Sequence, residues 1–182
     1  MKCKLFFAIV FLSFCFNLSS QISSFDRYWY FGLNAWDWSS GSPVAVSGCA
    51  LTNIEGCNTV NDVGGNLQFY GGDDKIYNKN NTLMPNSVGL LANITPKQGP
   101  IAVQVPNFSN RFYYIYPQGF GGTLRYSTID MTLQGGLGDV MPASKNIQLR
   151  PVVAEGILAI PKSTACNEYW LLTHGVNSNF LC

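Results

Sequence analysis

Charged side chains are scarce in this sequence. Aspartate, glutamate, lysine and arginine make up 12% of its 182 residues, and the formal net charge is +1. No cluster of lysine or arginine occurs that would neutralise phosphate groups, which argues against a nucleic acid as a partner. The surface is therefore expected to be neutral and polar, built from asparagine, serine, threonine and glutamine.

Metal-binding and catalytic patterns are also rare. The sequence has one histidine, His174, and no C-x-x-C, so it offers no zinc pattern. No G-x-S-x-G precedes His174, which removes the usual signature of a serine hydrolase. Because His174 ends a predicted strand, a ring that hydrogen-bonds locally is the favoured interpretation, with catalysis as the alternative.

Apolar runs of membrane length are missing. Leu5–Phe16 is apolar apart from one serine, but its twelve residues fall short of the length that a membrane helix needs, about 20 residues. The basic start Met1–Lys4 precedes this run and a polar stretch of small residues follows it, the pattern of a secretory signal peptide. Residues 1–20 are therefore predicted to be a signal peptide, and residues 21–182 an exported domain without a membrane span, secreted or held at the cell surface.

Short strands separated by turns dominate the rest of the chain. No stretch has the apolar period of a helix, and eighteen glycines mark frequent turns. Glu55–Asn86 shows the pattern most clearly, with three short strand-like runs and two glycine-rich turns typical of an antiparallel meander. An all-β fold is predicted, with further strands at Tyr28–Phe31, Pro43–Val46, Ile101–Val105, Arg111–Tyr116, Thr123–Asp130, Asn146–Leu149, Val153–Ile160 and Glu168–His174, and with loops over Gly32–Pro43 and Met131–Asp139.

The meander recurs along the chain. The runs Leu67–Tyr70, Phe112–Ile115 and Tyr169–Leu172 align as second strands of three copies, with Tyr70, Tyr114 and Trp170 at matching positions. A period of roughly 40 to 50 residues with about four strands is typical of β-propeller blades, and a β-sandwich is the alternative. We expect a partial propeller of about three four-stranded blades. Because a propeller closes with about four blades or more, the chain is expected to be the front portion of a longer protein.

Aromatic residues gather at Tyr28–Phe31. Core packing of the first strand is the favoured interpretation, because aromatic rings supply much of the buried area in β cores. A platform that stacks against sugar rings is the alternative.

Two cysteines, Cys49 and Cys57, flank a predicted hairpin through Thr52 and Asn53. An oxidising compartment would allow them to form a disulfide. The equal alternative is that Cys57 is a small buried residue on the inner face of a strand.

Acidic residues give the remaining candidate sites. Glu55 and Glu155 both precede a glycine at the start of a copy, and with His174 they are candidates to face the central channel and bind a ligand or a divalent metal. The copy that begins at Ile101 lacks the acid. Asp73 and Asp74 follow two glycines and would suit Ca²⁺, although an exposed hairpin turn explains them equally simply and is favoured.

An ordered set of short motifs carries a resemblance to a known family. The set comprises Trp29–Gly32, Ser39–Pro43, Glu55–Cys57, Gly65–Tyr70, Met84–Asn86, Leu124–Ser127, Asp130–Met131, Gly135–Val140 and Tyr169–Gly175. It resembles the N-terminal region of large secreted proteins of Bacteroidota, of the gliding-motility-associated kind that carry a type B sorting domain for type IX secretion. The resemblance implies a propeller-like repeat region, often followed by adhesion-type repeats and a C-terminal sorting domain.

Together these observations predict an exported binding or adhesion module without enzymatic activity or a required cofactor. Its ligand is expected to be extracellular, a glycan or a surface protein. The alternative function is a propeller hydrolase or lyase of the lactonase kind, in which channel carboxylates hold a divalent metal.

Overall fold

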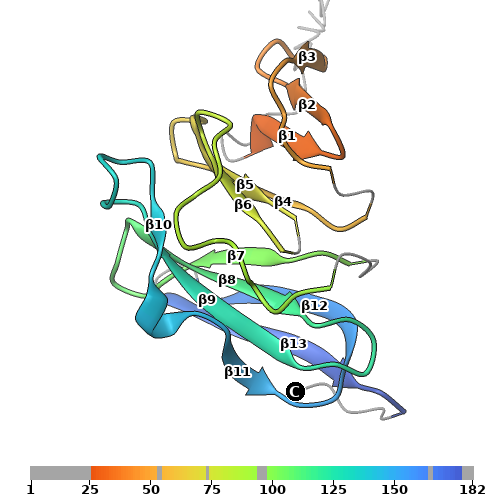
Figure 1. Cartoon of the computed structure of the whole chain (residues 1–182). Helices are drawn as coiled ribbons and strands as arrows, with labels where there is room; N and C mark the ends of the chain where they lie inside the picture. Colours follow the sequence, from red (N-terminus) through yellow and green to blue (C-terminus); the bar gives the residue numbers. More distant parts are fainter. Residues whose placement is uncertain (1–25, 53–54, 73, 94–97, 164–165, 178–182) are drawn as a thin grey trace, which may run out of the picture.

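The computed structural model describes residues 26–52, 55–72, 74–93, 98–163 and 166–177. The predicted signal peptide lies outside these ranges. Within them the chain is all-β, as predicted, and its strands form four antiparallel sheets (Figure 1). The same residues include no helix that is long and apolar enough to cross a membrane.

The four sheets follow one another in the sequence. The first contains β1 (Tyr28–Phe31), β2 (Asn34–Asp37) and β3 (Val44–Val46), and the second contains β4 (Asn58–Asn61), β5 (Leu67–Gly71) and β6 (Ile76–Asn78). The third contains β7 (Ile101–Gln104), β8 (Arg111–Pro117), β9 (Leu124–Asp130) and β10 (Asp139–Val140), with β11 (Ile147–Arg150) also paired to β9. The fourth contains β12 (Val153–Ser163) and β13 (Cys166–Gly175), and a short 3₁₀ helix, η2 (Pro142–Ser144), precedes β11.

Three apolar clusters lie between consecutive sheets and hold them together. Successive side chains of a strand point to opposite faces of its sheet. Phe69 of β5 therefore packs in the cluster shared with the third sheet, and its neighbour Tyr70 packs in the cluster shared with the first. In β8, Tyr114 faces the second sheet and Ile115 faces the fourth. Both inner sheets are thus covered on both faces, and Figure 1 shows the resulting stack.

Tyrosines form much of the core. Tyr70 lies between Tyr30 and Tyr77, with ring centroids 4.2 and 5.5 Å away. Burial raises the pKa of Tyr70 to about 12, and its hydroxyl donates a hydrogen bond to Asn81 Oδ1 at 2.9 Å. Tyr114 is fully buried, and its hydroxyl donates to the Gly72 carbonyl at 2.5 Å. A hydrogen-bonded hydroxyl lets a tyrosine be buried without leaving a polar group unpaired.

The strand β2 corrects the sequence prediction of a loop over Gly32–Pro43. Phe31 pairs with Asn34, so the connection from β1 is a two-residue turn made by Gly32 and Leu33. Both turn residues have positive φ, 39° and 65°. Such turns normally use asparagine, aspartate or glycine, so leucine gives no signal for a hairpin at this point.

The alignment of the three copies is also off by one residue in the last copy. Tyr70 and Tyr114 are buried against the preceding sheet, whereas Trp170 is 60% exposed. Trp170 pairs with Ile160 on the outer face of the fourth sheet, and its neighbour Leu171 packs toward the third. A shift of one residue moves a side chain to the other face of a sheet, so Leu171 is the counterpart of Tyr70 and Tyr114.

The first strands of the four sheets lie next to one another. β1 contacts β4, β4 contacts β7, and β7 contacts β12. Each sheet thus begins against the strand that began the preceding sheet. This places the starts of the meanders along one common line through the stack.

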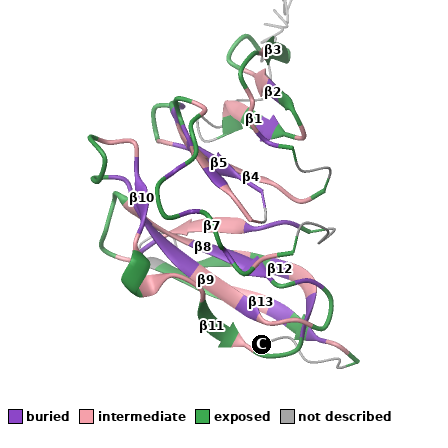
Figure 2. Ribbon diagram, viewed as in Figure 1, coloured by how far each residue is buried: buried purple, intermediate pink, exposed green. Residues whose placement is uncertain are grey.

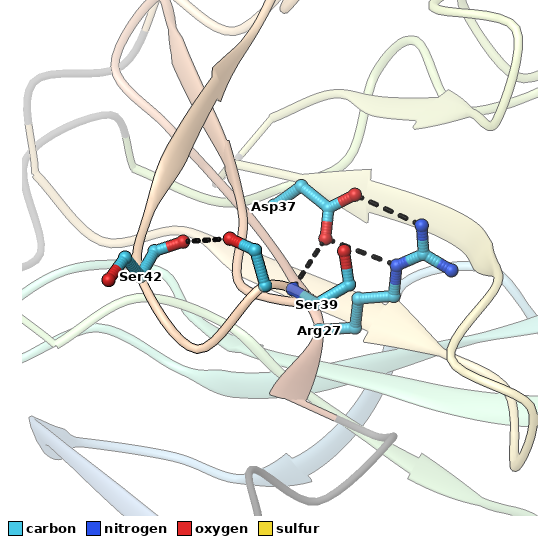
Figure 3. Close-up of polar contacts among 5 residues, drawn as sticks. Arg27, Asp37, Ser39 and Ser42 are labelled. Carbon is cyan, nitrogen blue, oxygen red and sulfur yellow. Dashed lines mark hydrogen bonds and ion pairs between the residues drawn. The ribbon is translucent and has the colours of Figure 1, made fainter.

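A charged pair closes one end of the first sheet. Arg27 donates two hydrogen bonds to the Asp37 carboxylate, from Nε at 3.2 Å and from Nη2 at 3.0 Å (Figure 3). Asp37 also accepts a hydrogen bond from the Ser39 amide at 2.8 Å. The bond from Arg27 is the largest influence, and it lowers the pKa of Asp37 from 3.8 to about 2.

This shift predicts an acid-sensitive contribution to stability. Because the folded pKa of Asp37 lies below its unfolded value, the stabilisation is complete above pH 3.8 and is lost as the pH falls toward 2. We expect Asp37→Asn to lower stability by about 0.5–1 kcal/mol at neutral pH, since the pair is partly exposed, and to flatten the pH dependence between about pH 4 and 2. Urea midpoints measured at several pH values check this. Arg27→Gln should reduce the pH dependence of stability over the same range. If wild type and both variants lose stability equally with falling pH, the Arg27–Asp37 pair is not its source.

Candidate functional site

The predicted channel residues lie near the first strands of the sheets. Glu55 stands three residues ahead of β4 and is exposed, and Glu155 lies within β12 and is half-buried. His174 lies near the end of β13, exposed, with its Nδ1 3.3 Å from the Gly175 carbonyl. Within the described residues, no three side chains of histidine, cysteine, aspartate or glutamate come close enough to hold a metal ion.

Sequence reasoning missed Gln98, which is the counterpart of Glu55 and Glu155 at the start of the third sheet. Gln98-Gly99 stands three residues ahead of β7, as Glu55-Gly56 stands ahead of β4. Gln98 Nε2 donates a hydrogen bond to the Ile157 carbonyl at 2.6 Å, which ties the start of the third sheet to β12 of the fourth. The sequence signal for Gln98 was the recurrence of glutamate or glutamine directly before a glycine. In the copy that begins at Ile101, glutamine stands where the other two copies have glutamate.

The structure brings part of this series together. A Cβ placed on Gly156 would lie 3.5 Å from Gln98 Oε1 and 3.7 Å from His174 Nε2. Gln98, His174 and the Glu155–Gly156 step therefore share one neighbourhood at the start of the fourth sheet. The backbones of Gly56 and Gly99 touch directly, because a Cβ on either one would overlap the other. A polar residue followed by glycine thus recurs at the starts of three sheets.

The acidic turn gives a simpler picture. Asp73 lies outside the described residues. Asp74 forms an ion pair with the adjacent Lys75, with 3.6 Å between Oδ2 and Nζ, and both side chains are about one third exposed or more. This geometry suits an exposed hairpin turn, the favoured interpretation of the sequence. Binding of Ca²⁺ there stays a prediction.

Cys49 and Cys57 are both half-buried and pack on the cluster between the first and second sheets. The structure contains no disulfide between them. Burial raises the pKa of the Cys49 thiol, which lowers its reactivity. Cys57 lies directly ahead of β4, and its pairing with Cys49 stays a prediction.

The aromatic run Tyr28–Phe31 was interpreted either as core or as a platform for sugar rings, and its residues divide between the core and the surface. Tyr30 is buried, and Tyr28 packs beside it on the cluster between the first and second sheets. Trp29 and Phe31 point to the outer face and are 48% and 38% exposed. The alternation along β1 therefore makes half of the run core and leaves the other half on the surface.

A groove lies between the third and fourth sheets. Its volume is about 330 Å³, within the range of ligand sites. We call it the tyrosine groove, and its walls are Val103, Pro106, Tyr113, Ile115, Tyr126, Leu149, Tyr169 and Leu171. The Tyr113 and Tyr126 rings meet edge to face with centroids 5.1 Å apart. The walls are apolar and aromatic, which suits binding rather than proton transfer.

A second hollow adjoins the tyrosine groove. It shares Pro106 and Tyr169 with the groove and adds Lys162, Glu168 and Trp170. Lys162 Nζ lies 2.8 Å from Glu168 Oε2, so the two charges compensate each other. This end of the groove therefore has polar groups without a net charge.

Comparisons of the chain with protein-family models, with curated proteins and with solved structures find no match.

Proposed function

We propose that this chain is an exported binding or adhesion module without enzymatic activity, built as an incomplete β-propeller. It would form the front of a cell-surface protein of the gliding-motility or type IX-secretion kind. The order of the first strands carries this proposal, since β1, β4, β7 and β12 contact one another in succession. In a propeller, the first strands of consecutive blades line the central channel in the same way.

Two further observations support a binding role. The four sheets stack through apolar clusters that use both faces of each inner sheet, as blades do. The tyrosine groove offers an apolar hollow with few polar groups, the usual character of a binding site. The signal-like N-terminus and the family resemblance support a role outside the cell.

The alternative, a propeller hydrolase or lyase, has one observation in its favour. Glu55, Gln98 and Glu155 recur at the starts of three sheets, where channel ligands of a metal would lie. Gln98, however, is a neutral amide that adds no negative charge to hold a divalent cation, and its Nε2 donates a hydrogen bond to the Ile157 carbonyl. A binding module therefore remains the better explanation.

Glycan binding and hydrolysis can be measured on the same preparation. We expect the exported chain to bind members of a panel of immobilised glycans and surface-protein peptides reversibly and to release them unchanged. Chromogenic glycosides and lactones, tested with and without Ca²⁺ or Mg²⁺, should not be turned over. Glu55→Gln should bind like wild type. Metal-dependent hydrolysis that Glu55→Gln abolishes would favour the alternative.

A further inference from the structure

The tryptophans of this chain lie at the two ends of the stack of sheets. The sequence has four of them, Trp29, Trp36, Trp38 and Trp170. In the described part of the chain, none belongs to the three apolar clusters between consecutive sheets, which consist of other aromatic and aliphatic residues. The chain therefore covers one sheet with the next without using tryptophan. A face rich in tryptophan indicates a different kind of contact.

Three of the tryptophans gather on the outer face of the first sheet. Trp29 of β1 stands opposite Trp36 of β2, so the two side chains point to the same face. Trp38 follows two residues after Trp36, and its ring centroid lies 4.9 Å from that of Trp29. Phe31 extends the same face along β1. We call these four residues the tryptophan platform. Figure 2 shows exposed and partly exposed residues alternating with buried ones along β1 and β2.

A hollow adjoins the platform where the first sheet meets β4. Its volume is about 370 Å³, within the range of ligand sites. Asp26, Trp29, Phe31, Asn58 and Thr59 are among the residues that line it. Trp29 and Phe31 thus belong both to the platform and to the wall of the hollow. A ligand in the hollow can lie against an exposed aromatic ring.

The edge of β1 beside this hollow is already bonded to β4 and does not await another strand. β1 pairs with β2 along its other edge. On the β4 side, Thr59 Oγ1 accepts a hydrogen bond from the Tyr30 amide at 2.8 Å and donates one to the Tyr30 carbonyl at 3.3 Å. Asn61 Nδ2 donates to the Tyr28 carbonyl at 3.1 Å. Side chains of β4 thus occupy the groups that strand addition would need, so a ligand other than a strand fits the hollow.

The hollow offers polar groups that the tyrosine groove lacks. Asp26 is exposed and forms no ion pair with a described residue, because the neighbouring Arg27 is bonded to Asp37. The Oδ1 atom of Asn58 accepts no hydrogen bond within the described residues. Since an asparagine amide turns readily about its last bond, this group can turn to a donor in the hollow. In the tyrosine groove, by contrast, the polar side-chain groups are hydroxyls of tyrosine.

This combination of groups suits a neutral sugar. A pyranose ring has an apolar C–H face that stacks on an aromatic ring, and hydroxyls at its rim that bond to carboxylate and amide groups. A cage for a quaternary ammonium ion needs rings that converge on one point. Here Tyr28 and Tyr30 point to one face of β1, and Trp29 and Phe31 to the other. The carboxylate of Asp26 disfavours uronic and sialic acids, which are negatively charged.

We propose that the tryptophan platform and the adjoining hollow bind a neutral sugar residue of an extracellular glycan. The ring of Trp29, held by its contact with Trp38, supplies the stacking surface. Asp26 and Asn58 bond to the hydroxyls at the rim of the sugar. This inference rests on the proposed binding function and names the class of its ligand and the site that holds it.

Tryptophan variants test the stacking surface. The probes are cellohexaose and chitohexaose, and their binding to the exported chain is measured by isothermal titration calorimetry. Trp29→Ala is expected to weaken binding of the probe that wild type binds by more than about tenfold, and Trp29→Phe should restore most of it. Trp170→Ala is the matched control, because Trp170 is likewise exposed but lies on the outer face of the fourth sheet, and it should leave binding unchanged. Circular dichroism should show that the variants remain folded.

A charge variant tests the selectivity for neutral sugars. Hexagalacturonate serves as the acidic probe and is expected to bind wild type more weakly than the neutral probes. Asp26→Asn removes the repulsion and should narrow this difference by about fivefold. Wild-type preference for hexagalacturonate would contradict the role of Asp26.

Other outcomes would overturn the sugar site. These are no binding of either neutral probe, or equal effects of Trp29→Ala and Trp170→Ala. Binding of surface-protein peptides without sugar binding, or sugar binding that Leu149→Lys in the tyrosine groove removes and Trp29→Ala does not, would overturn the site and leave the proposed binding function standing. Sugar binding with the expected pattern alongside metal-dependent hydrolysis would keep the site and overturn the proposed function instead.

Discussion

Replacing Gly99 with alanine is expected to disrupt the contact between the second and third sheets and to destabilise the whole chain. A Cβ on Gly99 would overlap the backbone of Gly56 and Cys57. Backbone atoms cannot move aside as the end of a flexible side chain can, so the two sheets must separate to admit one methyl group. Overpacking of this kind costs about 3 kcal/mol or more at such a site. Urea denaturation followed by circular dichroism measures the loss.

Gly156 offers a matched control for this prediction. It occupies the same step in the recurring series, but the nearest atoms to its Cβ position are side-chain atoms of Gln98 and His174 at 3.5 and 3.7 Å. These are ordinary contact distances. Gly156→Ala should therefore be neutral or stabilise the chain by up to about 0.5–1 kcal/mol, because alanine loses less backbone entropy than glycine on folding. Equal losses of stability in Gly99→Ala and Gly156→Ala would show that the Gly56–Gly99 contact does not require glycine.

Local pattern predicts most strands of this fold. The runs Tyr28–Phe31, Leu67–Tyr70 and Arg111–Tyr116 are rich in aromatic residues and end at turn residues, and each became a strand within one residue of its predicted bounds. β-Branched and aromatic side chains suit a half-buried pleated surface, so composition and alternation suffice. β2 was not predicted, because its hairpin turn contains Leu33 at positive φ, a conformation that leucine rarely adopts.

The face of a sheet to which a side chain points, and the close approach of two backbones, depend on contacts that a single sequence does not display. Trp170 was aligned with Tyr114, but only the pairing of β12 with β13 shows that Trp170 faces outward. Gly56 and Gly99 are far apart in the chain, but their backbones touch. This contact explains why neither position can carry a side chain, which local turn rules do not predict. The tyrosine groove likewise is lined by residues of β7, β8, β9, β11 and β13, and no residue pattern along one strand encodes that gathering.

Removing the Phe69 side chain is expected to have the largest effect of any core truncation in the second sheet. Phe69 is fully buried in the cluster between the second and third sheets. Its ring meets Phe112 and Tyr114 edge to face, with centroids 5.3 and 6.5 Å away. Phe69→Ala leaves a cavity among these rings and should cost about 3–5 kcal/mol, a large share of the about 5–15 kcal/mol that stabilises a typical domain. Urea midpoints at constant m-value measure this loss.

The control for Phe69 is Phe120, which is 71% exposed. Phe120→Ala should change stability by no more than about 0.5 kcal/mol, and a loss equal to that of Phe69→Ala would contradict the assigned core. Tyr70→Ala empties the opposite face of the same strand, where the cluster shared with the first sheet lies. If both Phe69→Ala and Tyr70→Ala unfold in one transition by near-UV and far-UV circular dichroism, the four sheets fold as one cooperative unit. Separate transitions in either variant would mean that each interface between sheets holds on its own, and that the stack behaves as a chain of nearest-neighbour contacts.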